Sequence, residues 1–418
     1  MGPRPDSVLF FNRAYPPSDQ ATAILLHQLA ESLRKQFDIR ISSEPMTMLT
    51  RYRLLSYLIY AMAGMLRALF SKRSTLAVIW SDPPMFNCAL GAVFRIRGMP
   101  YVQVIQDLYP EVLFRTNIMR REGLFGSLLA NIQRINLAHA ERVVAISPDM
   151  AEVLLHDYSL DRSKIVVIQN WSPISLPRSG APQRQLGSTD ETTDQKTQPF
   201  VVKYAGNLGV GFDCNMIVEI ARTLGSRTDI ALVIQGSGRY LWRVKELAQQ
   251  FPCIHLAERV DTKDVALSLQ QADAFLLPTP SHLAGALFPS KIYAYAALGR
   301  PVIVSAPPQS YLHTLIKEHE LGFTSHCHEV EKLVEHITTL AALKQNSPEE
   351  YWRIAANGFH YTSSVWNRQT AAARYADLFR EIGVATVKGQ VLDLNPTSAA
   401  IGSNTPRTSA QDDIKKSS

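Results

Sequence analysis

Short apolar runs rich in β-branched and aromatic residues alternate twice with amphipathic stretches along this chain of 418 residues. In the first half, strands are predicted at 8–11, 76–80, 101–105, 142–146 and 165–168, and helices at 21–36, 86–97 and 124–140. Strands that alternate with helices predict a parallel sheet that is covered by helices on both faces.

The same alternation begins again after a change of composition. Residues 172–199 are rich in Pro, Ser, Thr, Gly, Gln and charge, which predicts a linker or a disordered loop. The second set of strands is predicted at 200–204, 230–235, 253–256, 274–277 and 301–304, and its helices at 214–226, 240–250, 263–271 and 289–298. We therefore expect an α/β fold of two Rossmann-like domains with doubly wound parallel sheets, at 1–171 and 200–350. Helices are expected to continue through 351–386, and the polar sequence of 387–418 predicts a disordered tail.

The composition excludes several classes of protein. With 46% hydrophobic and 19% charged residues the chain is globular, and its net charge of +6 is spread along the sequence, so nucleic-acid binding is not indicated. The four cysteines lie far apart, which favours a reduced, cytoplasmic compartment and offers no metal-ligand spacing. The apolar run at 8–11 is too short for a signal-peptide core.

The positions of glycine-containing turns distinguish a dinucleotide site in the first half of the chain from a phosphate site in the second half. The loop at 12–20 contains no glycine, so the phosphate-binding turn of a nicotinamide dehydrogenase is missing. In the second half, Gly206-Asn207-Leu208-Gly209 and Gly236-Ser237-Gly238-Arg239 each follow a predicted strand. Backbone N–H groups of such turns can approach a phosphate, although turns of this kind also open ordinary helices.

A lysine near the start of a predicted helix adds to this pattern. Ser290 and Lys291 follow Pro289, so free N–H groups and one ammonium group would meet at the end of the sheet, which suits a diphosphate leaving group. An ordinary amphipathic helix with an incidental lysine is the alternative.

Several sequence blocks together resemble a known family. Pro289-Ser290-Lys291, followed by the Gly-Arg-Pro-Val of 299–302, resembles the donor-site helix of glycosyltransferase family 4, and especially the WbuB-like branch that builds bacterial envelope polysaccharides. Further blocks that resemble this branch occur in the same order at 12–23, 106–111, 146–148, 170–171 and 206–209. The resemblance implies the GT-B architecture, in which two Rossmann-like domains face each other across a cleft, with the acceptor on the N-terminal side.

The resemblance also implies an activity. Family 4 enzymes transfer a sugar from a nucleotide-diphosphate donor, here expected to be a UDP-sugar, with retention of configuration and without a metal or other cofactor. Lys291, the N–H groups near Ser290 and Arg239 are the expected partners of the leaving diphosphate, beside Gly206, Asn207, Gly209, Gly236 and Gly238. One of the C-terminal helices is expected to cross back to the first domain.

Other positions are assigned by their place in these blocks. Asp107 is expected to bind hydroxyl groups of the donor or the acceptor, and Glu111 to contact the acceptor or to support local structure. Asn12 and Tyr15 belong to the N-terminal loop, with an acceptor or structural role. The sequence departs from the family where many members carry two glutamates, because Ala286 and Ala294 stand there.

One apolar segment is flanked by basic residues on both sides. Residues 54–66 are uncharged and include Tyr57, Leu58 and Ile59, and the flanking basic residues are Arg51, Arg53, Arg67, Lys72 and Arg73. The run is shorter than a bilayer requires, so it predicts a helix that lies in the membrane interface, with a buried helix of the first domain as the alternative. We therefore expect a peripheral protein on the cytoplasmic face of an anionic membrane, with a polyprenyl-diphosphate-linked sugar or another saccharide as acceptor.

Two other functions fit the same architecture. A non-hydrolysing nucleotide-sugar epimerase would be an isomerase, and it offers no reason for the run at 54–66. A binding protein that has lost activity would explain Ala286 and Ala294, whereas Asp107 and Lys291 argue against it.

Overall fold

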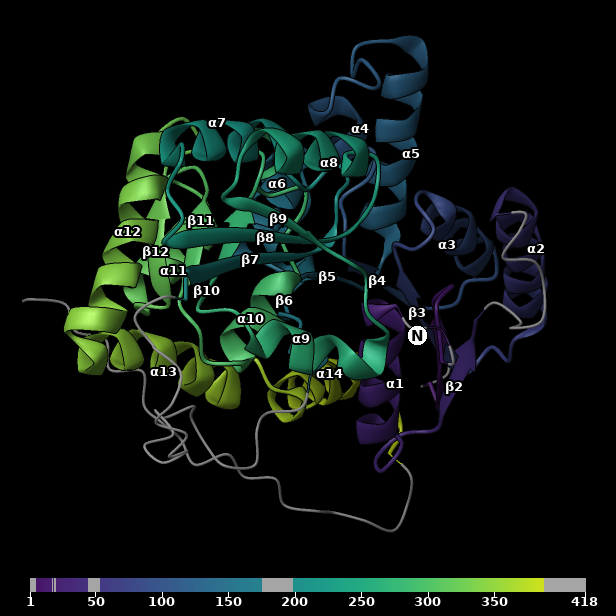
Figure 1. The fold of residues 1–418 in the computed structure, drawn as a ribbon. Coiled ribbons are helices and arrows are strands. Elements are labelled where there is room, and N and C mark those ends of the chain that lie inside the picture. Colours follow the sequence, from purple (N-terminus) through teal and green to yellow (C-terminus); the bar gives the residue numbers. More distant parts are fainter. Residues whose placement is uncertain (1–4, 17, 19, 44–52, 175–197, 387–418) are drawn as a thin grey trace, which may run out of the picture. The chain divides into compact units, whose positions relative to one another are not determined.

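A computed structural model describes residues 5–16, 18, 20–43, 53–174 and 198–386. Its first sheet has six parallel strands in the order β2-β1-β3-β4-β5-β6 (Figure 1). The strands are β1 (Ser7–Phe11), β2 (Ile39–Ser42), β3 (Thr75–Trp80), β4 (Tyr101–Ile105), β5 (Arg142–Ala145) and β6 (Ile165–Val167). Strands β1, β3 and β4 are completely buried, which explains their predominantly apolar sequences.

The second sheet also has six parallel strands, in the order β12-β11-β10-β7-β8-β9. They are β7 (Phe200–Asn207), β8 (Ile230–Ser237), β9 (Ile254–Ala257), β10 (Ala274–Pro278), β11 (Val302–Ser305) and β12 (Gly322–Ser325). The strand order reverses between β7 and β10, and parallel α/β sheets bind ligands at such a reversal. The α/β class with two Rossmann-like sheets is thus confirmed.

Helices connect the strands in both halves. In the first half they are α1 (Ala21–Leu33), α2 (Arg53–Phe70), α3 (Phe86–Ile96), α4 (Glu111–Arg115), α5 (Leu124–His139) and α6 (Pro148–His156). In the second half they are α7 (Cys214–Leu224), α8 (Leu241–Gln250), α9 (Val265–Gln270), α10 (Lys291–Ala297), α11 (Tyr311–Glu318), α12 (Val330–Asn346), α13 (Pro348–Ser364) and α14 (Arg368–Ile382).

The last helix, α14, packs against α1 at the beginning of the chain (Figure 1). Phe379 of α14 contacts Phe10 and Phe37 edge to face, with ring centroids 6.4 and 5.5 Å apart. The backbone N–H of Ala385 also donates to the carbonyl of Pro5 at 2.8 Å. The end of the described chain is therefore attached to the first sheet.

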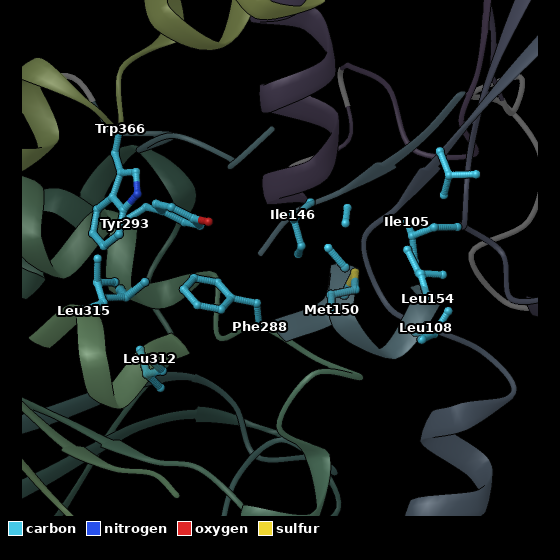
Figure 2. Close-up of a cluster of buried hydrophobic side chains, with 14 of the residues drawn as sticks. Ile105, Leu108, Ile146, Met150, Leu154, Phe288, Tyr293, Leu312, Leu315 and Trp366 are labelled. Atoms are coloured by element: carbon cyan, nitrogen blue, oxygen red, sulfur yellow. The ribbon is translucent and has the colours of Figure 1, made fainter. Parts of the chain in front are cut away.

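An apolar cluster combines residues from both halves of the chain (Figure 2). Met150 and Leu154 of α6 belong to it, as do Phe288 and Tyr293 around the start of α10. Tyr293 lies edge to face against Trp366, with ring centroids 4.8 Å apart. This cluster supports the segments that border the candidate site.

Helix α2 is buried on one side and exposed on the other. Tyr60 and Ala68 are buried, whereas Leu58, Met62 and Leu66 are more than half exposed, at 54%, 61% and 53%. The helix is therefore neither a fully buried core helix nor fully solvated. Among the described residues, no helix combines the length and the apolar character needed to cross a bilayer.

Some predictions fall wholly or partly outside the described residues. Arg51 lies outside, as do most of the predicted linker at 172–199 and the predicted tail at 387–418. The domain boundaries given above stay predictions from the sequence.

Candidate functional site

A cavity of about 290 Å³ opens where the strand order of the second sheet reverses. Asn207 at the end of β7 and Thr279 just after β10 lie on its wall, together with Asp107 and Asp149 from the first half of the chain. The remaining lining residues are Tyr109, Val210, Gly211, Pro280, Leu283, Ala284, Leu287, Phe288, Pro289, Ser290, Lys291, Ala306, Pro307, Ser310 and Leu312. The cavity therefore brings together segments that are far apart in the sequence.

The turn at Gly206 requires the absence of a side chain. Gly206 has φ = 148° and pairs with Gly236 of the neighbouring strand β8. A β-carbon on Gly236 would lie 1.8 Å from the Gly206 carbonyl oxygen, and one on Gly238 would lie 2.6 Å from that of Leu208. The two glycine turns are therefore packed backbone against backbone at the end of the sheet.

Helix α10 is fixed to this turn by Tyr295. The Tyr295 hydroxyl accepts from the backbone N–H of Ala205 at 2.8 Å and donates to the carbonyl of Ala205 at 3.1 Å. Its ring stacks on Phe275 of β10 with centroids 3.9 Å apart. These contacts set the beginning of α10, and with it Lys291, next to Gly206.

Lys291 is the first residue of α10, two positions later than the sequence predicts for the start of the helix. Its ammonium nitrogen lies 5.3 Å from the centroid of the Tyr204 ring, a cation–π contact. Ser290 precedes the helix and is exposed, and no described residue accepts a hydrogen bond from the backbone N–H of Ser290 or Lys291. Unpaired N–H groups next to an ammonium group form an environment that attracts an anion.

Asp107 lines the same cavity and interacts electrostatically with Lys291. The Asp107 side chain is exposed to solvent inside the cavity. Protein atoms surround the cavity, so the Asp107 carboxylate is still shielded from bulk water. The pKa of Asp107 is raised to about 6, mainly by burial and also by the Asp82 carboxylate, and the Lys291 ammonium group opposes both effects. Burial lowers the pKa of Lys291 to about 8, and the Asp107 carboxylate opposes this shift.

Asp82 is itself held by an ion pair. Its carboxylate lies 3.3 Å from the Arg13 guanidinium, in the loop after β1. Asp82 and Ser81 follow β3, and the Ser81 hydroxyl accepts from the backbone N–H of Gln106 at 3.0 Å. The strand ends of the first sheet thus hold the segment that carries Asp107.

Glu111 was expected near the cleft, and the structure places its side chain elsewhere. Glu111 is only 2% exposed and does not line the cavity. Its carboxylate lies 2.6 Å from the Arg121 guanidinium and accepts from the Tyr158 hydroxyl at 3.0 Å. A buried carboxylate needs such partners, so the observed role of Glu111 is structural.

Other predicted residues also have partners within the protein. The side-chain amide of Asn12 donates to the carbonyl of Ala14 at 2.6 Å, and the Tyr15 hydroxyl lies 3.1 Å from Nδ1 of His27. Neither Asn12 nor Tyr15 lines the cavity.

Five predicted donor contacts, Gly206, Gly209, Gly236, Gly238 and Arg239, are not among the residues that line the cavity. Arg239 is exposed, and its guanidinium carbon lies 5.1 Å from the centroid of the Tyr240 ring. Gly209 packs against the side chain of Asn207, which does line the cavity. Gln106 forms a reciprocal amide pair with Asn170 at 2.7 and 3.4 Å, away from the wall.

The two alanines at the family's glutamate positions are buried. Ala286 is fully buried, and its carbonyl accepts from the backbone N–H of Leu108 at 2.9 Å. Ala294 is 8% exposed and belongs to the apolar cluster that also contains Tyr293. Both positions contribute packing, and neither supplies a carboxylate to the site.

The sequence did not indicate several polar residues of the cavity wall, among them Asp149, Thr279 and Ser310. Asp149 is the second residue of α6, and one of its oxygens accepts from the Ser147 hydroxyl at 2.5 Å and from the N–H of Met150 at 3.0 Å. Ser310 caps α11, and Thr279 follows β10. The block at 146–148 was the available signal, since Asp149 is the next residue.

No group of three or more His, Cys, Asp or Glu side chains among the described residues is arranged to hold a metal ion. The described polar groups of the cavity are two carboxylates, one ammonium group, hydroxyl groups and one amide. Such a set can bind the hydroxyl groups and the anionic part of one ligand.

Two family models match successive parts of the chain. Residues 15–171 match "Glycosyl transferase 4-like domain", and residues 190–359 match "Glycosyl transferases group 1". A curated relative, "Probable glycosyltransferase WbjE" of Pseudomonas aeruginosa, is 22% identical over 261 residues. That match covers 60% of this chain and 62% of the relative.

Solved structures share the fold at low sequence identity. HepE from Anabaena in complex with UDP is 13% identical with a TM-score of 0.60, and the match covers 90% of this chain and all of HepE. WaaG, a glycosyltransferase involved in lipopolysaccharide biosynthesis, is 16% identical with a TM-score of 0.60, over 89% of this chain and 99% of WaaG. These similarities establish the GT-B fold.

Proposed function

Because the chain belongs to the family 4 glycosyltransferases of GT-B fold, we propose that it transfers a sugar from a UDP-sugar to a lipid-linked or saccharide acceptor, with retention of configuration and without a metal. The relatives named above do not distinguish the WbuB-like branch, which stays a prediction from the sequence blocks. A role in polysaccharide biosynthesis of the cell envelope is part of this proposal, and the described role of WaaG supports it.

The proposal rests on one observation: the Lys291 side chain passes directly over Gly206, and Lys291 and the neighbouring Asn207 both line the cavity. A leaving UDP carries negative charge on its diphosphate, and charge that develops in the transition state is stabilised most by groups already in place. The ammonium group of Lys291 and the N–H groups at the start of α10 are such groups. UDP is the nucleotide of the HepE complex, which supports it as the nucleotide here.

Asp107, which also lines the cavity, supplies an acceptor for sugar hydroxyl groups. Its raised pKa, about 6, leaves it mostly ionised at neutral pH, so it accepts hydrogen bonds from hydroxyl groups. At the same pH Lys291, with a pKa of about 8, is mostly charged. The two side chains therefore have opposite tasks: one orients a sugar, and the other stabilises the departing diphosphate.

Donor binding is tested by thermal shift with a panel of nucleotides and nucleotide sugars. A ligand that binds only the folded protein raises its melting temperature by mass action. UDP and one or more UDP-sugars should raise the midpoint of the wild type, and the Lys291→Ala variant should lose most of that shift. A shift with NAD and none with UDP would contradict the proposed donor class.

Helix α2 is the proposed contact with the membrane that supplies a lipid-linked acceptor. Leu58, Met62 and Leu66 are exposed on one side of it, and Arg67 is exposed among them. Lys72 and Arg73 follow the helix and are exposed too. Apolar side chains next to basic ones are the pattern of a helix in the interface of an anionic bilayer.

Removal of the positive charges near α2 tests this contact. Changing Arg67, Lys72 and Arg73 together to Gln should reduce cosedimentation with vesicles that contain phosphatidylglycerol, because each basic residue near an anionic surface contributes about 1 kcal/mol. The matched control changes Lys245, Lys263 and Lys317, which are equally exposed and lie in the second half of the chain. Equal sedimentation of the two triple variants would contradict the α2 contact.

A further inference from the structure

Helix α5 exposes a row of large apolar side chains to solvent. Leu124, Phe125 and Leu128 are 82%, 72% and 52% exposed, and Ile132 and Ile135 on the next turns are 38% and 37% exposed. The spacing of residues 124, 128, 132 and 135 places them along one side of the helix. Surface helices ordinarily turn such a stripe toward the core.

The buried side of α5 combines the apolar Leu137 with two amide side chains. Gln133 and Asn136 are 2% and 5% exposed. The Gln133 side-chain oxygen accepts from the Sγ of Cys88 at 2.7 Å, and the Asn136 side-chain oxygen accepts from the Gln103 amide at 3.3 Å. Amide side chains buried against strand β4 and helix α3 therefore hold α5 in place, which leaves the row of apolar side chains outside.

The exposed apolar side chains are concentrated in one part of the chain. Among the described residues, fourteen large apolar side chains are markedly exposed, and twelve of them lie between Leu58 and Ile135. These twelve belong to α2, α3 and α5 and to the segments beside them. Helix α3 packs between α2 and α5, so the three helices form a continuous layer (Figure 1). An exposed apolar patch of this extent marks an interaction surface.

The charges of this layer indicate which partner it fits. Helices α2, α3 and α5 contain no Asp or Glu, whereas Arg67, Arg95 and Arg134 are exposed on them. In the segment before α5, Arg120 is exposed beside Ile118, and the acidic residues nearest to the helix in the sequence are Glu122 and Glu141, two positions outside its ends. Apolar side chains with basic neighbours match the boundary between acyl chains and anionic headgroups.

We infer that the outer side of α5, with Ile118, enters the interface of an anionic lipid bilayer as a second contact beside α2. The inference extends the membrane contact proposed for α2, but it depends neither on that helix nor on glycosyl transfer. Two separated contacts fix the orientation of the first sheet toward the bilayer, which a single helix does not. The buried amides fit this role, since hydrogen bonds hold a helix whose apolar side faces lipid.

The test is cosedimentation of the full chain with phosphatidylcholine vesicles with and without phosphatidylglycerol. The variant carries Leu128→Gln and Ile132→Gln, two exposed side chains one turn apart. The matched control carries Trp242→Gln and Leu267→Gln, which are 64% and 65% exposed in the second half of the chain. The α5 variant should bind about tenfold more weakly than the wild type, whereas the control should bind like the wild type.

Three readouts separate the possible failures. If the α5 variant binds vesicles as well as its control, the α5 contact is overturned, while the charge variant of α2 in the same assay decides the α2 contact separately. If the wild type ignores vesicles and forms a dimer that the α5 substitutions dissolve, the partner is a second copy of this chain. UDP binding and the melting temperature, measured on the same samples, should stay unchanged in the α5 variant.

Discussion

The side chain of Lys291 crosses Gly206 so closely that a β-carbon on residue 206 would lie 2.0 Å from Cε of Lys291. The Gly206 turn and the ammonium group of α10 therefore form one unit. Its geometry depends on the absence of a side chain at position 206, where φ is 148°.

The first prediction follows from this contact. Gly206→Ala should displace Lys291 and reduce kcat/KM by about 100-fold or more, as expected when a charged group leaves the transition state. Gly98→Ala is the control, since Gly98 also has a positive φ, 61°, and a β-carbon there would meet nothing within 4 Å. The control should lose some stability and keep its affinity for UDP. Calorimetric titration with UDP that gives the wild-type affinity for Gly206→Ala would disprove the unit.

The second prediction concerns pH. Transfer needs an ionised Asp107 and a protonated Lys291, whose pKa values are about 6 and about 8. Plotted against pH, kcat/KM should form a bell that falls below about 6, as Asp107 gains a proton, and above about 8, as Lys291 loses one. A kcat/KM that stays constant from about pH 5 to about pH 9 would contradict both roles.

The third prediction uses the coupling of the same two groups. The Asp107 carboxylate raises the pKa of Lys291, so Asp107→Asn should move the alkaline limb of the bell to lower pH. The acid limb should disappear in the same variant. An alkaline limb that keeps its position would show that the two groups do not interact.

The contribution of Asp107 to the free energy of unfolding changes with pH in the direction opposite to its contribution to kcat/KM. The pKa of Asp107 is raised on folding, so this carboxyl group contributes less to stability as the pH rises through about 6.

The fourth prediction separates structure from function at Glu111. Glu111→Ala leaves the Tyr158 hydroxyl and Arg121 without their partner, so the free energy of unfolding should fall by about 1–3 kcal/mol. Urea denaturation measures this loss, and Glu122→Ala, at an exposed position nearby, is the control. Wild-type stability together with a raised KM for the acceptor would restore the acceptor role.

Most strands could be predicted from the sequence because buried parallel strands are predominantly apolar. Strand β4 has the predicted bounds, Tyr101–Ile105, and β3 begins one residue before the predicted start. The sheets also contain β2 and β12, which the sequence did not indicate. Both are edge strands of four residues with partly exposed side chains, so they lack the continuous apolar pattern.

The candidate site was predictable where a local motif carries it. Lys291, Ser290, Asn207 and Asp107 line the cavity as expected. Asp149 and Ser310 were missed because they belong to the starts of α6 and α11, two short helices that the sequence pattern did not predict. Glu111 lies four residues after Asp107, yet helix α4 begins at Glu111 and its side chain meets Arg121 instead of the cavity. Which of two neighbouring carboxylates faces a cavity is decided by packing between distant segments.

The most direct test of the account is the release of UDP from a panel of UDP-sugars, measured with membrane extract as the source of acceptor, for the wild type and Lys291→Ala. The wild type should release UDP from at least one donor, with transfer of the sugar to the extracted acceptor and with no loss of rate in EDTA. Lys291→Ala should be about 100-fold slower or more and should remain folded, because it removes one charge from the leaving diphosphate. Release by the variant within a few-fold of the wild type, or no release from any donor by the wild type, would contradict the assignment of this cavity as a glycosyltransferase active site.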